Sequence, residues 1–410
     1  MPKNDIVAAL DMGSSQISCA IGRRDEVSGE LNVLGAGFLP CRGLRGGVVI
    51  NINETAHAVS KVIEQAEEMA RESIQSLYIG IRGHHLQAFN HHGALNIART
   101  DKEITPEDVS LVIENAKAIP ISSDREIIHT LPQEFALDRQ TGVPDPIGME
   151  GSLLEVDVHL VTASSSHLNN IWKAINRAGF KIVEPISSLL AVGDVVISPE
   201  ERELGCLLLD MGGQSILIGI YSEGSIRYAR EIPIGSDFIT KDISYGLRTS
   251  LITAKNIKEK YGVAMLSFLN GDEEDVEYTN VDGRTVNKIR RSTLVEVIQP
   301  RVEEIFNLIN DEIKNSGYID YIAPGGIVMT GGGAKLQGMV AAAEQVLGLP
   351  TRLGMTQGIH GHESVIGDLT YATVLGLLNF QGMNEWSKNR RALRKQPFWK
   401  KAASIFEEIF

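Results

Sequence analysis

A chain of 410 residues with 43% hydrophobic and 22% charged residues is typical of a globular protein that can form two or more compact units. The net charge of −13 argues against general nucleic-acid binding, so we expect no nucleic-acid partner. Three scattered cysteines indicate neither a disulfide framework nor a zinc site. Because we find no signal peptide and no run of about 18 apolar residues, we expect a cytoplasmic protein that at most lies on a membrane surface.

The first informative pattern is a strand, a small turn and a second strand within residues 6–23, which read IVAALDMGSSQISCAIGR. The apolar strand ends at Asp11, the turn passes through Gly13, Ser14 and Ser15, and Gln16 leads into the second strand. Backbone N–H groups of such a turn can point at phosphate oxygens, because small residues let the backbone approach closely. An aspartate at the strand end can hold Mg²⁺ through water. One such turn alone is also compatible with an ordinary hairpin.

The same pattern returns in residues 204–221, LGCLLLDMGGQSILIGIY, where the strand-end aspartate lies 199 residues after the first one. A third turn, rich in glycine, lies within residues 327–339, IVMTGGGAKLQGM, between an apolar strand and an expected helix. Two matching turns and a late glycine turn favour phosphate binding over chance hairpins. The candidate residues in the second and third turns are Asp210, Gly212, Gly213, Gln214, Ser215, Gly331, Gly332 and Gly333.

Paired turns of this kind resemble the actin, sugar-kinase and DnaK-type chaperone superfamily. The resemblance implies an α/β fold in which two lobes clamp ATP with Mg²⁺, with one phosphate hairpin in each lobe. It also implies that the late glycine turn, together with Lys335, lies against the adenosine. Residues 183–196 and 365–378 resemble the two helices that cross between the lobes.

Most of the chain further resembles the FtsA family of actin-like bacterial cell division proteins. Residues 80–98, 104–119 and 127–163 resemble the family's inserted SHS2 subdomain, and the last of these contains the long pattern D…G…DPIGM.G..L. Residues 292–318 resemble a helix of the family's second lobe. The resemblance runs nearly from one end of the chain to the other, and its motifs are specific.

Two local patterns agree with this reading. Thr105 and Asp108 predict a helix start close to a capping box. Apolar residues within 294–313 recur with a period of about 3.6, as on one face of a helix. Pro300 interrupts that stripe, so we expect a kink or a helix start there. The turn at residues 162–167 is expected to join a strand to a helix with capping hydroxyls.

The resemblance implies a division of the chain into consecutive segments. The first lobe comprises residues 1–82 and 164–197 around the inserted subdomain at 83–163, and the second lobe comprises 198–360. Within the second lobe, a partner-binding subdomain is expected at about 235–305 and the adenosine turn at about 327–339. The remaining segments are an interlobe helix at 361–381, a flexible basic tether at 382–397 and an amphipathic helix at 398–410.

Several positions depart from the family pattern. Gln214 stands where a glycine is expected, Leu217 where an acid is expected and Lys255 where a glutamate is expected. Lys258, which the resemblance assigns to nucleoside contact, is retained. Glu184 matches a glutamate that aids a hydrolytic water, or else is a surface or helix-capping carboxylate. These departures favour ATP as a structural ligand and at most weak ATPase activity.

The last thirteen residues read FWKKAASIFEEIF and follow a basic stretch. From residue 388 onward, seven basic against two acidic residues give a charge of +5, and the total of −13 leaves −18 for the rest. At about 100° per residue on a helix, the aromatic and aliphatic side chains fall in one sector. Such a helix suits an anionic membrane interface, or it docks on the protein's own core. The family resemblance favours the membrane, with Phe398, Trp399, Lys400, Lys401, Ile405, Phe406, Ile409 and Phe410 as binding residues.

The resemblance implies a protein that polymerises on the cytoplasmic face of the inner membrane at the division site. It implies that the second lobe binds the C-terminal tail of the tubulin-like protein FtsZ and that the inserted subdomain recruits later division proteins. Candidate tail-binding cations are Lys288, Arg290, Arg291 and Arg301, which could also form a solvated basic face. The alternatives are a PilM-like scaffold of pilus assembly and a small-molecule kinase of the sugar-kinase type. The basic tether and aromatic helix argue against the first alternative, and the lack of a catalytic aspartate motif argues against the second.

Overall fold

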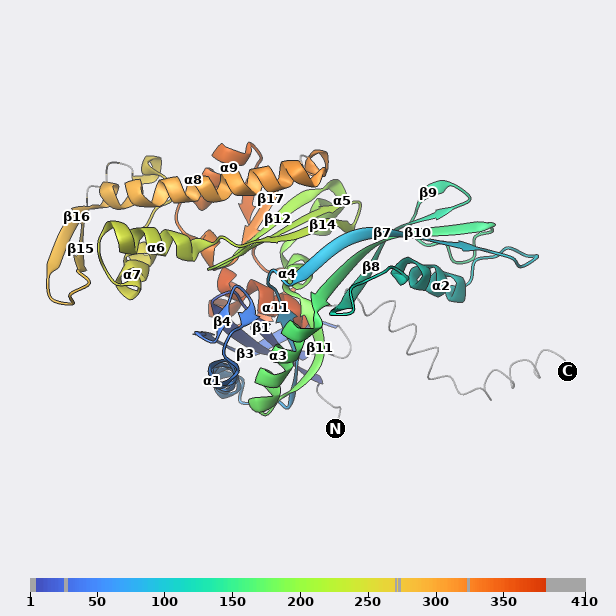
Figure 1. The fold of residues 1–410 in the computed structure, drawn as a ribbon, viewed down its shortest axis with the longest axis horizontal. Helices are drawn as coiled ribbons and strands as arrows, with labels where there is room; N and C mark the ends of the chain where they lie inside the picture. Colours follow the sequence, from blue (N-terminus) through green and yellow to red (C-terminus); the bar gives the residue numbers. More distant parts are fainter. Residues whose placement is uncertain (1–4, 26–28, 270, 272–273, 323–324, 381–410) are drawn as a thin grey trace.

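The computed structural model of the chain describes residues 5–25, 29–269, 271, 274–322 and 325–380. Two lobes stack on each other, and a third unit projects from one side (Figure 1). The first lobe, in blue, contains α1 (Ile52–Ala70), the second contains the long α8 (Arg291–Ser316), and the projecting unit, in teal, contains α2 (Pro106–Lys117). This arrangement confirms the predicted two-lobed α/β fold with an insertion.

Six strands form the sheet of the first lobe in the order β11-β6-β1-β2-β3-β19. β1 pairs antiparallel with β2 and parallel with β6, so Asp11 of β1 lies opposite Gly80 of β6. The residue that follows β6, Arg82, therefore arrives at the same edge of the sheet as the first phosphate turn. The strands are β1 (Asp5–Met12), β2 (Gln16–Arg24), β3 (Leu31–Pro40), β6 (Ser76–Ile81), β11 (Lys181–Ser187) and β19 (Ile359–Gly361).

The sheet of the second lobe repeats this arrangement with five strands in the order β14-β13-β12-β17-β18. β12 pairs antiparallel with β13 and parallel with β17, and all six residues of β12 are buried. The repeated sequence pattern thus corresponds to a repeated hairpin joined to a parallel strand. The strands are β12 (Cys206–Met211), β13 (Ile216–Ser222), β14 (Ser225–Ile232), β17 (Ile327–Thr330) and β18 (Thr351–Leu353).

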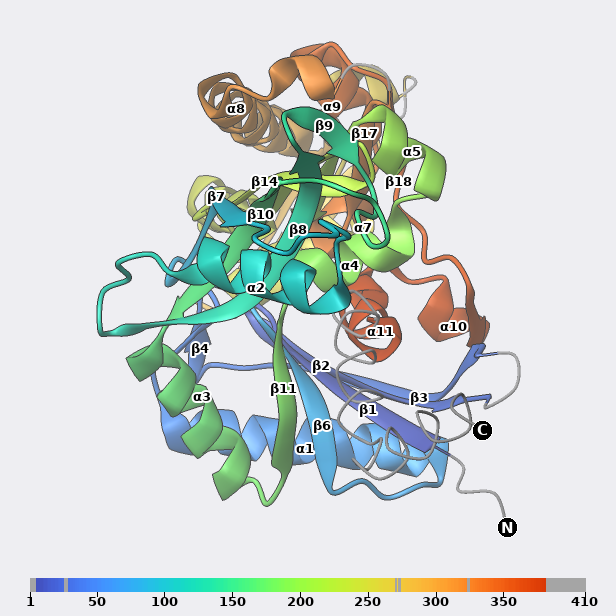
Figure 2. The ribbon, with the colours of Figure 1, turned by 90° about the vertical axis from the view of Figure 1, so that its right-hand side faces the viewer.

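Two short helices, α4 (Ser188–Val196) and α11 (Ala372–Asn379), lie side by side between the lobes (Figure 2). Their buried side chains form one apolar core with residues of both central sheets, for example Ala9 and Leu208. The two helices approach closely, since a Cβ at Gly376 would lie 2.1 Å from the Ala191 carbonyl oxygen. The opposite face of the first sheet is covered by α1 and α3 (Ser165–Arg177). Residues 183–196 and 365–378 therefore contain the predicted crossing helices.

The projecting unit is a four-stranded sheet in the order β7-β10-β8-β9 with α2 against it. The predicted capping box starts α2: the Asp108 carboxylate accepts from the backbone N–H of Thr105 at 2.8 Å, and the Thr105 hydroxyl accepts from the Asp108 N–H at 3.3 Å. Arg99 pairs with the same carboxylate at 2.6 Å. The strands are β7 (Leu86–Asn96), β8 (Arg125–Leu137), β9 (Gln140–Val143) and β10 (Leu153–Ser164).

The remaining elements complete the lobes. In the first lobe, β4 (Leu44–Arg45) and β5 (Val48–Val49) form a short ladder. In Figure 1 the hairpin of β15 (Asp275–Thr279) and β16 (Val286–Arg290) lies at the end of the molecule away from the projecting unit. The other helices are α5 (Pro199–Leu204), α6 (Ser236–Gly246), α7 (Leu251–Tyr261), α9 (Met339–Leu347) and α10 (Glu363–Ile366). The 3-10 turns are η1 (Leu266–Leu269), η2 (Ile319–Tyr321), η3 (Gly332–Lys335) and η4 (Leu369–Tyr371).

Two local predictions are corrected in part. Of the two alternatives at Pro300, a kink or a helix start, the helix start is wrong, because α8 runs through Pro300 from Arg291, held by a buried apolar stripe that includes Leu294 and Ile305. A proline removes one backbone hydrogen bond, and burial of the stripe outweighs that loss. The turn before α3 is where we predicted it, but the side chain of its N-cap, Ser164, makes no capping bond. Within the described part of the chain, no helix is both long and apolar enough to cross a membrane.

Candidate phosphate-binding site between the lobes

The two predicted phosphate turns face each other across the space between the lobes. The backbone N–H of Gln214 donates to the Ser14 hydroxyl at 3.1 Å, and the Gln214 side-chain oxygen accepts from the N–H of Gly46 at 3.0 Å. A Cβ at Gly213 would lie 2.4 Å from the Ser15 hydroxyl oxygen. Turns encoded about 200 residues apart are therefore in direct contact, as a clamp around phosphate requires.

Asp11 is the next-to-last residue of β1, just before the first turn, and is buried, with 7% of its surface exposed. Its Oδ1 accepts a hydrogen bond from the Ser188 hydroxyl, at the start of α4, at 2.8 Å. Burial raises the pKa of the Asp11 carboxyl to about 6, although Arg82 and the Ser188 hydrogen bond act in the opposite direction. The Asp11 carboxyl therefore lies in a low-dielectric position and is bonded to another residue of the first lobe, Ser188.

Asp210 is the next-to-last residue of β12, just before the second turn, and is also buried. Its Oδ2 accepts from Nη1 of Arg82 at 3.2 Å and from the Thr373 hydroxyl of α11 at 3.5 Å. The late glycine turn reaches the same carboxylate, since a Cβ at Gly331 would lie 2.3 Å from Oδ1 of Asp210. Gly331 also has φ +84, a backbone conformation that favours glycine. All three predicted turns thus meet around Asp210 and Asp11.

Three buried polar groups at this meeting point have no hydrogen-bond partner among the described residues. They are the hydroxyls of Ser215 and Thr330, and Nε and Nη2 of Arg82. Unpaired buried donors cost free energy, on the order of 1–3 kcal/mol each, so such groups at one place indicate a missing acceptor. A phosphate group carries acceptor oxygens, and it would pair with both hydroxyl and guanidinium donors.

The predicted lysines take different positions. Lys258 of α7 donates to the Ser236 carbonyl at 3.0 Å, at the start of α6 and directly behind the second phosphate turn. Burial lowers the pKa of Lys258, with the Asp237 carboxylate acting against that shift. Lys335 of η3 instead pairs with both carboxylate oxygens of Asp368, at 2.9 and 3.0 Å. Lys258 therefore supports the turn, whereas Lys335 is engaged outside it.

The other predicted site residues and departures are placed as follows. Glu184 lies half-buried on β11, four residues before Ser188. Leu217 is buried on β13 directly opposite Asp210 in the strand pairing, so an apolar side chain fills the position where the family pattern has an acid. Lys255 forms a solvent-exposed pair with Glu259 at 3.7 Å on α7.

The basic residues predicted for partner binding lie on β16 and α8. Lys288 is exposed and pairs with Asp275 at 3.2 Å, and Arg290 and Arg291 follow it at the junction of the two elements. Arg301 is held by Asp242 of α6, with Nη2 to Oδ1 at 3.1 Å. The predicted membrane-binding residues of 398–410 lie outside the described residues.

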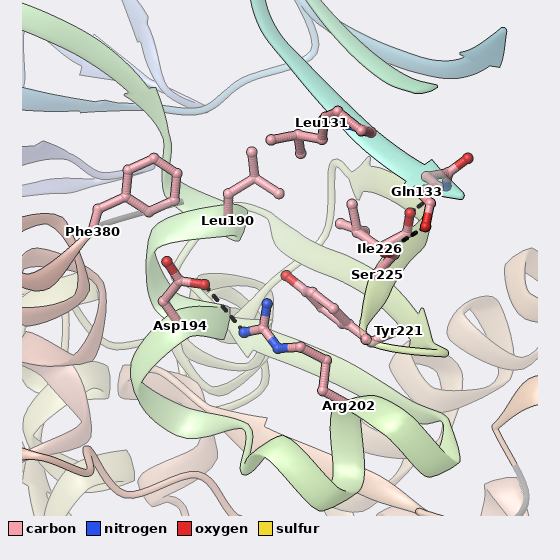
Figure 3. Close-up of a pocket in the computed structure, with 11 residues that line it drawn as sticks. Leu131, Gln133, Leu190, Asp194, Arg202, Tyr221, Ser225, Ile226 and Phe380 are labelled. Atoms are coloured by element: carbon pink, nitrogen blue, oxygen red, sulfur yellow. Dashed lines mark hydrogen bonds and ion pairs between the residues drawn. The ribbon is translucent and has the colours of Figure 1, made fainter. Parts of the chain in front are cut away.

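A small, partly open cavity of about 140 Å³ lies elsewhere, at the root of the projecting unit (Figure 3). Leu131 and Gln133 of β8 line one side, and Leu190 of α4 and Tyr221 of β13 line the other. Arg202 pairs with Asp194 at 3.1 Å, and its guanidinium lies 4.9 Å from the centre of the Tyr221 ring. The cavity marks the contact of the inserted unit with both lobes and is separate from the phosphate turns.

Sequence reasoning missed Arg82, Ser188 and Thr373, which complete the surroundings of the two aspartates. Each lies at the end of an element, after β6, at the start of α4 and on α11 respectively. One signal was available for Arg82, because carboxyl ends of parallel strands meet at one edge and β6 could be predicted next to β1. Nothing local in the sequence marks Ser188 or Thr373.

Comparisons with known proteins show the family to which the chain belongs. The family model described as "Cell division protein FtsA" matches residues 207–376, and the model "SHS2 domain inserted in FTSA" matches residues 83–162. The chain is 38% identical to a cell division protein FtsA of Pseudomonas aeruginosa over 375 residues, covering 92% of this chain and 89% of that one. The chain belongs to the FtsA family. FtsA proteins of Escherichia coli K12 and Bacillus subtilis are 34% and 32% identical to it and cover 92% and 97% of it.

Solved structures outside the FtsA family share the fold. The PilM-PilN type IV pilus biogenesis complex contains a chain that aligns with a TM-score of 0.66 at 15% identity, covering 92% of this chain and 98% of that one. MreB5 of Spiroplasma citri bound to ADP aligns with a TM-score of 0.57 at 13% identity, covering 95% of this chain and 99% of that one. These likenesses support the actin-like architecture of this FtsA-family chain.

Proposed function

We propose that this FtsA-family cell division protein binds ATP between its lobes, polymerises, and tethers FtsZ filaments to the cytoplasmic face of the inner membrane at the division site. The main support for ATP binding is the contact of the two phosphate turns through Ser14 and Gln214, with unpaired buried donors beside them. The ADP in the related MreB5 structure supports a nucleotide in this fold.

ATP acts here as a structural ligand that draws the lobes together. The phosphates would lie against Gly13, Ser14, Ser15, Gln16 and the turn from Gly212 to Ser215, and the adenosine would lie near Lys258 and the late glycine turn. The apolar Leu217 and the cationic Lys255 stand in place of acids, so we expect an ATPase rate below about one turnover per minute, far under ordinary enzyme rates. Glu184 is the candidate to orient water in that slow reaction.

The FtsZ tail is assigned to the second lobe, near α6, α7 and the hairpin of β15 and β16. Large apolar side chains are exposed there, including Ile252 at 72%, Val281 at 73% and Tyr245 at 90%. The N–H of Val281 donates to the Arg248 carbonyl at 3.0 Å, so the hairpin turn and the loop between α6 and α7 lie together. Exposed apolar side chains in this region, together with Lys288 and Arg290 on β16 of the same hairpin, suit a short peptide with apolar and acidic residues.

Membrane attachment is assigned to residues 398–410 from their sequence pattern, with later division proteins bound by the inserted subdomain at 83–163. One amphipathic helix binds a membrane modestly, and a polymer multiplies that affinity through avidity. ATP-dependent polymerisation therefore couples the nucleotide site to the membrane.

Co-pelleting with anionic liposomes tests this function. The full chain and a variant truncated after Gln396 are compared with and without ATP. We expect binding that requires the last fourteen residues and strengthens with ATP. Equal pelleting of the two proteins would mean that residues 397–410 do not bind the membrane. Pelleting that does not change with ATP would mean that nucleotide-driven assembly does not strengthen membrane binding.

A further inference from the structure

Arg82 lies where a phosphate-bound cation would be expected. It follows β6 in the first lobe, has 4% of its surface exposed, and its Nη1 pairs with Asp210 of the second lobe at 3.2 Å. Its Nε lies 4.0 Å from Oε1 of Glu231, whose other oxygen accepts from the N–H of Gly83 at 2.5 Å. The guanidinium of this first-lobe residue therefore lies beside two carboxylates of the second lobe, Asp210 and Glu231.

The free side of the guanidinium faces the second phosphate turn. Nη2 lies 3.4 Å from the position a Cβ would take at Gly212, and neither Nη2 nor Nε has a hydrogen-bond partner within the described residues. A buried arginine with unpaired donors is costly, and its planar fork matches the oxygen spacing of a phosphate. Because Gly212 belongs to the turn that cradles phosphate, an incoming phosphate would supply the missing acceptors.

The same arrangement is a poor fit for a tightly held divalent cation. The predicted water-mediated Mg²⁺ site relies on Asp11 and Asp210, but Asp11 is bonded to Ser188 and Asp210 to Arg82. No group of three or more histidine, cysteine or acidic side chains suited to a metal occurs in the described part of the chain. A fixed positive charge on Arg82 also repels a second cation at the same carboxylates.

We propose that Arg82 takes the place of the divalent cation in this chain, so that its guanidinium binds the outer phosphates of the nucleotide and binding depends little on Mg²⁺. This inference rests on the proposed ATP binding. The proposed contact would also link the two lobes, because Arg82 of the first lobe would bridge the phosphates to Asp210 of the second lobe. Nucleotide and Arg82 would then close the lobes together.

The test is the affinity of the purified full chain for ATP, measured by calorimetry in Mg²⁺ and in EDTA. We expect the wild-type affinity to change by less than about threefold when Mg²⁺ is removed. In Arg82→Ser the guanidinium is lost, so binding in EDTA should weaken by at least about tenfold, the size expected for one charge-assisted contact. Arg82→Lys keeps the charge without the planar fork, so its affinity for ATP in EDTA should lie between those of the wild type and Arg82→Ser.

A matched control is Arg284→Ser, which removes a cation from an exposed turn between β15 and β16. It should behave as the wild type in both buffers. The wild-type comparison requires no substitution, so the proposal remains testable if Arg82→Ser does not fold. A wild-type protein that binds ATP in Mg²⁺ and loses at least about tenfold in EDTA would overturn the role of Arg82 and leave the proposed function intact. A wild-type protein that binds no ATP in either buffer would overturn both.

Discussion

The side chain of Gln214 joins the second phosphate turn to the turn between β4 and β5 of the first lobe, because its Oε1 accepts a hydrogen bond from the backbone N–H of Gly46 at 3.0 Å. Glycine is expected at this position in the family pattern, and it could not make this contact. The Gly46 N–H is shared with the Ser14 carbonyl, also at 3.0 Å. The departure from the pattern thus adds a hydrogen bond between the two lobes.

Replacing Gln214 with alanine should weaken the closed arrangement when no nucleotide is bound. The Gly46 N–H keeps its other acceptor, so the loss should be about 1 kcal/mol of unfolding free energy. With saturating ATP the difference from the wild type should shrink, since the phosphates would then bridge the same turns. Thermal unfolding with and without ATP measures this, with Gln140→Ala at the exposed end of β9 as the control. An equal loss of stability with and without ATP would show that the contribution of Gln214 does not depend on the nucleotide.

Much of this architecture could be predicted because its signals are local. The turn after Asp11 and its copy after Asp210 are short and contiguous, and the capping box at Thr105 needs only four residues. Patterns of this kind fix where an element starts and what its turn can contact. The placement of one turn in each lobe of an ATP clamp was implied by the superfamily resemblance and not by either turn alone, and the direct contact of the turns was not predicted.

The composition of the site was less predictable because it depends on the ends of distant elements. Arg82 and Thr373 meet at Asp210 only after β6, β12 and α11 have packed together. Sequence shows that a side chain is charged but not what neutralises it. Lys335 and Arg301, predicted to contact nucleotide and partner, are paired with Asp368 and Asp242.

Substituting Gly376 should test the close packing of α4 and α11. A Cβ at this position would lie 2.1 Å from the Ala191 carbonyl oxygen, so the helices must separate to admit even alanine. We expect Gly376→Ala to lower the free energy of unfolding by about 1–3 kcal/mol, the usual cost of overpacking. Chemical denaturation measures the change.

The matched control is Gly246→Ala at the end of α6, where an added Cβ would meet Val297 at an ordinary 3.6 Å. That substitution should be neutral or stabilising by up to about 1 kcal/mol, as expected for glycine to alanine in a helix. If both variants lost the same stability, the close approach at Gly376 would not be the cause.

Acid should destabilise the junction of the inserted unit with the first lobe. Burial lowers the pKa of His129 and of His159 to about 4 from an ordinary value of 6.5. Between about pH 4 and 6.5 these histidines bind more protons in the unfolded chain than in the folded protein. The stability contributed by each neutral histidine is therefore complete above about pH 6.5 and is lost as pH falls toward 4. Asp11, whose pKa is raised to about 6, acts in the opposite direction between about pH 4 and 6.

The variant His129→Gln tests this dependence and keeps an acceptor for the Ser187 N–H, which donates to Nε2 of His129 at 2.9 Å. Removing one titrating group should reduce the slope of unfolding free energy against pH by about 1.4 kcal/mol per pH unit between about pH 6.5 and 4. Urea denaturation across this range measures the slope, and His57→Gln on the exposed side of α1 is the control. An unchanged slope for His129→Gln would mean that another group governs the acid response.

Phe406→Asp should release the protein from anionic membranes. The sequence places Phe406 in the apolar sector of residues 398–410, and Ser404 falls on the opposite, polar side. A carboxylate in the apolar sector must be dehydrated to enter the interface, and it also repels anionic lipid. Ser404→Asp adds the same charge on the polar side, so it isolates the effect of position.

We expect liposome pelleting to fall at least about tenfold for Phe406→Asp, more than for Ser404→Asp. Equal losses would indicate simple charge repulsion, and unchanged pelleting of both would indicate that this segment does not bind the membrane.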